Sequence, residues 1–119
     1  MTQTITAADL IQFTGSEQWY RHGFVWKVLY TDGVQYVAEK CGAYWLIDEI
    51  AFGQMKRKIK AEEFQVWRLS VNPDQTASLT CDDGNGRVVF TKRIEFTDFP
   101  LNEIRFYFTN NTILLPSEY

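Results

Sequence analysis

The chain has 119 residues, of which 45% are hydrophobic, 23% charged and 16% aromatic, with a formal net charge of −3. This length fits a single domain over residues 1–119, with a core large enough to need neither a disulfide nor a metal. The composition excludes a disordered chain, and the mild negative charge argues against a nucleic-acid binder that is basic over its whole surface.

The sequence shows neither the pattern of a signal peptide nor that of a membrane-spanning segment. The N-terminal stretch MTQTITAADLIQF lacks a basic region followed by an apolar one, so it does not resemble a signal peptide. The longest near-apolar run, residues 43–47, is far below the roughly 20 residues that span a bilayer. We therefore expect a cytoplasmic protein with no membrane partner.

The N-terminal part of the chain is predicted to form a short helix and then a strand. Thr6 with Asp9 three residues later is a helix start signal, and it predicts a helix over residues 7–13. Residues 19–30 alternate with apolar side chains on both faces. This pattern predicts one long strand at the centre of a sheet, covered on each side.

Two helices are predicted next. Asp32 is a candidate N-cap, and apolar residues recur at helical spacing from there to Cys41. Gly42 either ends this helix or is tolerated inside it, and a second helix follows from Ala43. The second helix is apolar over most of its circumference, which is typical of an interior or an interface.

Beyond residue 63 the apolar period changes from helical to two, and about five strands follow, separated by turn residues. The strongest hairpin signal is Asp82-Asp83-Gly84-Asn85-Gly86, and Asn110-Asn111 predicts a later turn. The sequence therefore predicts an α+β fold with a mostly antiparallel sheet of about five or six strands. The central helices should pack on one face, and the short N-terminal helix should precede them.

Chemical motifs are few. His22 is the only histidine, so a nucleophilic centre would have to pair it with Cys41 or Ser16, but no local motif supports either pair. Cys41 and Cys81 are expected to be buried free thiols, with a disulfide between them as the alternative. We find no metal-ligand spacing and no cofactor motif, so we predict no catalytic residue, metal or cofactor.

A basic tract is the main candidate for a nucleic-acid contact. It contains Lys56, Arg57, Lys58 and Lys60, and aromatic residues lie nearby in the sequence. The alternative is the solvated end of a helix, where these charges complement the helix dipole and pair with Glu62 and Glu63.

The aromatic excess is the most informative feature, because Tyr and Trp beyond the needs of a core suit protein interfaces. The alternative is that they line a thick core. The candidate partner-binding residues comprise four aromatic anchors and an acidic rim: Trp19, Tyr20, Tyr44, Trp45, Asp48 and Glu49.

Several stretches carry a resemblance to a known group of proteins: FTGSEQWYRH, YTDGVQYVAE with GAYWLIDEIA, LTCDDGNG, IEFTDFPL and ILLPSEY. With these motifs the chain resembles an uncharacterised bacterial family of small proteins, a domain of unknown function. The resemblance implies a small cytoplasmic protein of bacterial genomes and mobile elements, and it implies no catalytic residue. A mobile-element setting favours an inhibitor of a bacterial defence complex, such as a CRISPR-type complex, that acts by binding a protein.

The sequence thus favours a non-enzymatic module that binds a protein partner or a second copy of itself. For an inhibitor of a nucleic-acid-guided complex, we expect acidic side chains to compete for that complex's basic surface. A small enzyme or ligand-binding domain that uses His22 and Cys41 is the first alternative. Nucleic-acid binding through residues 56–60 is the second.

Overall fold

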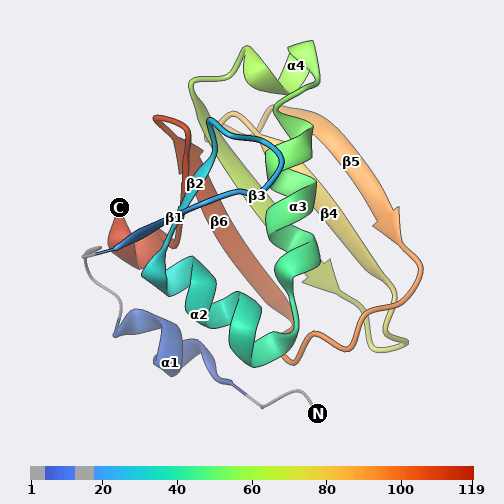
Figure 1. The fold of residues 1–119 in the computed structure, drawn as a ribbon. Coiled ribbons are helices and arrows are strands. Elements are labelled where there is room, and N and C mark those ends of the chain that lie inside the picture. Colours follow the sequence, from blue (N-terminus) through green and yellow to red (C-terminus); the bar gives the residue numbers. More distant parts are fainter. Residues whose placement is uncertain (1–4, 13–17) are drawn as a thin grey trace.

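The computed structural model describes residues 5–12 and 18–119, and these form a seven-stranded sheet with helices on one face (Figure 1). The sheet is mostly antiparallel, so the predicted α+β class is confirmed, with more strands than the five or six expected. The strands are β1 (Trp19–Arg21), β2 (Leu29–Thr31), β3 (Phe64–Val71), β4 (Ala77–Asp82), β5 (Val88–Ile94), β6 (Glu103–Thr109) and β7 (Thr112–Leu114). The helices are α1 (Ala7–Ile11), α2 (Asp32–Cys41), α3 (Tyr44–Gly53) and α4 (Arg57–Lys60), and a 3-10 turn spans Pro116–Glu118.

The sheet has the order β1-β2-β7-β6-β3-β4-β5. Strand β3 lies inside the sheet and is paired antiparallel with β6 on one side and β4 on the other. In this register Trp67 lies between Phe106 and Cys81, which puts all three on the same face. The only parallel pairing described is β2 with β7, and it joins the N-terminal hairpin to the rest of the sheet.

The helical layer covers the face of the sheet that carries Trp67. The apolar stripe of α2, which includes Val34, Val37 and Cys41, is buried as predicted. On α3 the residues Leu46, Ile47, Ile50 and Ala51 are buried. Figure 1 shows both helices in front of the same face of the sheet. Two helices therefore close one core against the alternating apolar residues of the central strands.

The N-terminus of α2 differs from the prediction. The N-cap is Thr31, whose hydroxyl oxygen accepts a hydrogen bond from the amide of Val34 at 3.3 Å, so Asp32 lies inside the first turn. Glu118 of the 3-10 turn also binds here, because its carboxylate accepts from the Thr31 hydroxyl at 2.7 Å and from the Gly33 amide at 3.3 Å. A carboxylate is favoured at this end of a helix by the helix dipole.

The single long strand predicted for residues 19–30 is wrong. The segment is a hairpin of two short strands, β1 and β2, at the edge of the sheet, joined by the loop 22–28. The ring Nδ1 of His22 accepts hydrogen bonds from the amides of Phe24 (3.1 Å) and Val25 (2.9 Å). Because these amides are turned toward the ring, they are not available to a strand ladder.

Other local predictions are confirmed. The capping box at Thr6 and Asp9 is present, and α1 follows it, although residue 13 of the predicted helix lies outside the described residues. Gly42 ends α2 in the left-handed conformation with φ 61°. Cys41 and Cys81 are both free and buried.

A close contact between α3 and the sheet gives a stability prediction. A Cβ built on Gly53 would lie 2.8 Å from the Trp67 ring, whereas one on Gly23 would meet no atom within 4 Å. We expect Gly53→Ala to lower the free energy of unfolding by about 1–3 kcal/mol. Helix propensity alone would raise that free energy by about 1 kcal/mol, so a net loss identifies the steric contact. Urea unfolding measures the change, with Gly23→Ala as a control expected to be nearly neutral. A Gly53→Ala protein as stable as the wild type would contradict this packing.

Candidate functional site

Large apolar side chains are exposed on the loop 22–28 and on the adjoining end of α3. Phe24, Trp26 and Met55 have 84%, 72% and 75% of their surface exposed, and Phe52 is also exposed. The rings of Phe24 and Phe52 lie 6.3 Å apart between centroids, so the loop and the helix form one continuous surface there. We call Phe24, Trp26, Phe52 and Met55 the aromatic surface.

Buried His22 fixes this loop on α3. Its Nδ1 accepts from two loop amides, so the ring proton is on Nε2 and is donated to Oδ1 of Asp48 at 2.8 Å. The ring also packs edge-on against Phe52, with centroids 5.4 Å apart. Both ring nitrogens are therefore used to hold the loop, and the aromatic side chains are displayed on a fixed backbone.

Cations border the aromatic surface. The Arg21 guanidinium lies 5.5 Å from the centre of the Trp26 ring and donates a hydrogen bond to the Trp26 carbonyl. Lys27 is exposed on the same loop, and Lys56 is exposed immediately after Met55. The nearby carboxylate of Asp48 accepts from the neutral ring of His22 and keeps its negative charge. The three cations outnumber this carboxylate, so the border is locally positive in a chain whose net charge is −3.

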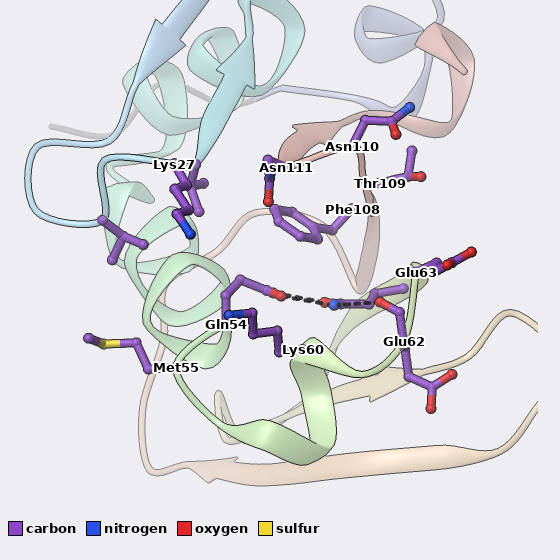
Figure 2. Close-up of a pocket in the computed structure, with 13 residues that line it drawn as sticks. Lys27, Gln54, Met55, Lys60, Glu62, Glu63, Phe108, Thr109, Asn110 and Asn111 are labelled. Carbon is purple, nitrogen blue, oxygen red and sulfur yellow. Dashed lines mark hydrogen bonds between the residues drawn. The ribbon is translucent and has the colours of Figure 1, made fainter.

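An open cleft of about 770 Å³ lies beside the aromatic surface (Figure 2). It is lined by the loop 22–28, by the segment that joins α3 through α4 to β3, and by the turn between β6 and β7. Val25, Val28 and Phe108 supply its apolar lining. Lys27 and Lys60 supply cationic groups from different segments. The volume falls within the range of small-molecule sites.

The buried carboxamide of Gln65, with only 1% of its residue surface exposed, forms part of the cleft wall. Its Nε2 donates to Oε1 of Gln54 (2.9 Å) and to the carbonyls of Ile59 (3.0 Å) and Glu62 (3.1 Å). Its Oε1 accepts from Nε2 of Gln54 (2.8 Å) and from the indole of Trp67 (2.9 Å). One side chain thus joins α3, α4 and β3.

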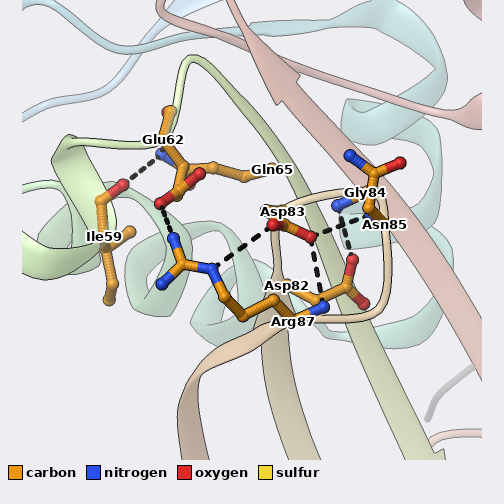
Figure 3. Close-up of polar contacts among 8 residues, drawn as sticks. All are labelled: Ile59, Glu62, Gln65, Asp82, Asp83, Gly84, Asn85 and Arg87. Carbon is orange, nitrogen blue, oxygen red and sulfur yellow. Dashed lines mark hydrogen bonds and ion pairs between the residues drawn. The ribbon is translucent and has the colours of Figure 1, made fainter.

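Arg87 anchors the other side of the same connection (Figure 3). Its guanidinium lies 2.6 Å from the carboxylate of Glu62 and 3.4 Å from that of Asp83. Asp83 also accepts from the amides of Asn85 and Arg87, and these bonds lower the pKa of its carboxyl. The predicted turn at residues 82–86 is therefore confirmed, and its carboxylates bind backbone amides of that turn.

Of the six predicted partner-binding residues, Tyr20, Tyr44 and Asp48 each interact with Tyr30, and the others have different neighbours. Trp19 is exposed on β1, and the half-buried ring of Tyr20 stacks on Tyr30 with centroids 5.5 Å apart. Tyr44 is exposed, and its hydroxyl donates to Glu39 at 2.9 Å.

The remaining three turn toward different neighbours. Trp45 is half-buried against the core. The carboxylate of Asp48 accepts from His22, and that of Glu49 lies 2.6 Å from Nζ of Lys92 on β5. The sequence did not predict the aromatic surface. The one available signal was Gly23, because a glycine inside a predicted strand can mark a break in it.

The basic tract lies on and around α4. Lys56, Arg57, Lys58 and Lys60 are all exposed. The ammonium of Lys56 lies 5.9 Å from the centre of the Phe90 ring, and Lys60 lines the cleft. The expected ion pair between this tract and Glu62 is wrong, because the carboxylate of Glu62 binds Arg87 instead.

His22 and Cys41 have separate surroundings. His22 makes its hydrogen bonds with Asp48 and its own loop. Burial and, secondly, the charge of Asp98 raise the pKa of the Cys41 thiol from 9.0 to about 11. An activated nucleophilic thiol has a lowered pKa, so this environment is that of an inert buried cysteine.

In the part of the chain that the structure describes, no three His, Cys, Asp or Glu side chains come together in a group that could hold a metal ion. No helix within those residues has the length and apolar character needed to cross a bilayer. The fold and its surfaces define a small α+β protein with an exposed aromatic surface next to an open cleft.

Comparison with protein-family models gives one match, to the family of unknown function DUF6876, over residues 4–119. The chain therefore belongs to this family, which confirms the resemblance to a domain of unknown function. Comparison with curated proteins and with solved structures found no match.

Because of the buried thiols, we expect the free energy of unfolding to fall as the pH rises through the alkaline range. Burial raises the pKa of Cys41 to about 11 and of Cys81 to about 12, both from 9.0, because the neutral thiol is favoured in the fold. This contribution is complete below about pH 9 and is lost as the pH rises toward 11. We expect the urea midpoint to fall between pH 8 and pH 11, and to fall less in Cys41→Ala. Tyr30 and Tyr44, whose pKa values are also raised, remain in both proteins. An equal fall in both would show that Cys41 makes no contribution.

Proposed function

We propose that this chain is a non-enzymatic binding module whose aromatic surface receives a protein segment that is apolar and carries acidic groups. The observation that carries the proposal is the exposure of Phe24, Trp26 and Met55 on a loop and helix end that are held in place. Large aromatic side chains on a fixed backbone lose little conformational freedom on binding, which is the property of interface anchors.

The charge around the surface selects the kind of partner. Arg21, Lys27 and Lys56 border it, and the charge of Glu49 is compensated by Lys92. These cations outnumber the carboxylate of Asp48, which the neutral His22 ring binds without compensating its charge. A segment with Asp or Glu beside its apolar residues complements this border. The result is a preference for acidic over basic partners.

The same charges argue against self-association through this surface. A two-fold symmetric dimer places a surface against its own copy, so the cationic border of one copy would meet that of the other. A heterologous partner avoids this repulsion. We therefore propose a protein of another kind as the occupant, in place of the homodimer that the sequence left open.

Selection from a library of displayed random peptides tests the proposal. The library is first depleted on a Phe24→Ser/Trp26→Ser variant and then selected on the wild type. We expect the recovered peptides to combine apolar residues with Asp and Glu. They should bind the variant at least about 30-fold more weakly, since loss of an interface anchor typically costs 2 kcal/mol or more.

The matched control is Phe96→Ser, because Phe96 is a comparably exposed aromatic residue (70%) outside the aromatic surface. We expect it to bind the peptides like the wild type. No enrichment, enrichment of Lys- and Arg-rich peptides, or equal binding by the loop variant would contradict the proposal. Salt-sensitive binding of a mixed-sequence single-stranded oligonucleotide through the same residues, without peptide binding, would favour nucleic acid instead.

Inhibition of a bacterial defence complex stays a more specific prediction within this function. Competition by acidic side chains does not follow from the aromatic surface, because its border is positive. An inhibitor acting here would have to bind an acidic part of its target. Light scattering of the mixture with a candidate complex, repeated with Phe24→Ser/Trp26→Ser, distinguishes this route from binding elsewhere on the chain.

A further inference from the structure

We propose that the cleft beside the aromatic surface binds a small organic anion, a molecule with an apolar body and a carboxylate, phosphate or sulfonate group. This goes beyond the proposed function, because the ligand is a small molecule and, apart from Met55 and the bordering Lys27, the cleft is lined by other side chains. The cleft has a volume of about 770 Å³, which is enough for a molecule of nucleotide size. Apolar lining and convergent polar groups are the usual composition of such sites.

The cationic groups of the cleft come from two directions. Lys27 belongs to the loop 22–28, and Lys60 belongs to α4. In Figure 2 their side chains extend from opposite walls toward Gln54. No ion pair joins either ammonium to a carboxylate of the described residues. An anionic group in the cleft would therefore find two positive charges that no described carboxylate neutralises.

The two acidic residues of the lining, Glu62 and Glu63, do not direct their carboxylates toward an anion bound between the lysines. The carboxylate of Glu62 lies 2.6 Å from the Arg87 guanidinium, so its charge is compensated. Figure 2 shows the carboxylates of Glu62 and Glu63 turned away from the space between Lys27 and Lys60, and Figure 3 shows Glu62 directed to Arg87. The electrostatic balance inside the cleft is therefore set by the lysines.

The remaining walls fix the shape of the cleft. Gln54 and Gln65 bind one another and backbone carbonyls, so this wall is rigid. Asn110 and Asn111 form the β6–β7 turn with φ of 51° and 59°, and the Asn111 carbonyl accepts from the Leu29 amide at 2.8 Å. Both asparagines line the cleft, and Phe108 and Val25 can contact an apolar body.

Fluorescence titration with two naphthalene probes tests the proposal. The anionic probe is 8-anilinonaphthalene-1-sulfonate, and N-phenyl-1-naphthylamine has the same rings without the sulfonate. We expect Lys27→Gln/Lys60→Gln to bind the anionic probe at least about tenfold more weakly than the wild type and to leave the neutral probe unchanged. Lys60→Gln alone should give a smaller loss in the same direction.

Two controls locate the site. Arg57→Gln/Lys58→Gln removes the same number of charges from exposed positions of α4 that do not line the cleft, and it should bind both probes like the wild type. Phe24→Ser/Trp26→Ser should also keep anionic-probe binding, which separates the cleft from the aromatic surface.

The proposal is overturned if the lysine variant binds the anionic probe as tightly as the wild type. Equal weakening in the Arg57→Gln/Lys58→Gln control, equal weakening of the neutral probe, or loss of anionic-probe binding in Phe24→Ser/Trp26→Ser would also overturn it. None of these results bears on the peptide selection, so failure of the cleft and failure of the aromatic surface are distinguishable.

Discussion

The hydrogen bonds of the Gln65 carboxamide join α3, α4 and β3, and the structure of this end of the molecule depends on them. A buried amide is costly unless each of its polar atoms is bonded, and here Gln54, Trp67 and two backbone carbonyls satisfy it. The short α4 has no side-chain cap, and in α4 only Ile59 is buried, so it has little apolar contact of its own. This network, the buried side chain of Ile59 and the Arg87–Glu62 ion pair join it to the sheet.

The two candidate binding features lie at the end of the molecule that this network organises. The segment from Gln54 to Gln65 forms one wall of the cleft, and Met55 in the same segment belongs to the aromatic surface. The loop 22–28 forms the opposite side and is held by the bonds of His22 to Asp48 and to its own amides. Binding groups placed on fixed segments lose less entropy when they meet a ligand. The fold thus holds the cleft walls, with Lys27 and Lys60, and the adjoining exposed aromatic rings on fixed segments.

Much of the fold could be predicted from local patterns. Strands β3 to β7 follow from the period of two, and the boundary between α2 and α3 follows from Gly42, because only a short-range pattern is needed in each case. Residues 19–30 could not be predicted correctly, since an apolar residue such as Phe24 or Trp26 looks the same in a sequence whether it is buried or exposed. The amides of Phe24 and Val25 donate to His22 instead of to a strand, and the His22 ring is itself bound by Asp48, 26 residues away.

The cleft and the aromatic surface were also hard to predict, because they too depend on contacts between distant parts of the chain. The cleft is lined by segments from three separate parts of the chain, and Glu118 reaches the start of α2 across 85 residues to Gly33. Such contacts depend on the strand order, which periodicity does not determine. The predicted anchors Tyr44 and Trp45 lie at the other end of α3 from Phe52, which belongs to the aromatic surface. Several aromatic residues are exposed, but the sequence did not place Phe24, Trp26 and Phe52 among the candidate anchors.

Amide hydrogen exchange of Gln65→Met tests most directly whether this network holds the binding end of the molecule. Met keeps the length of the side chain and removes its polar atoms. We expect the hydrogen-bonded amides of residues 59–62 to exchange at least about tenfold faster than in the wild type, while those in the centre of α2 change much less. Unchanged exchange at residues 59–62, or an equal increase in α2, would contradict the account.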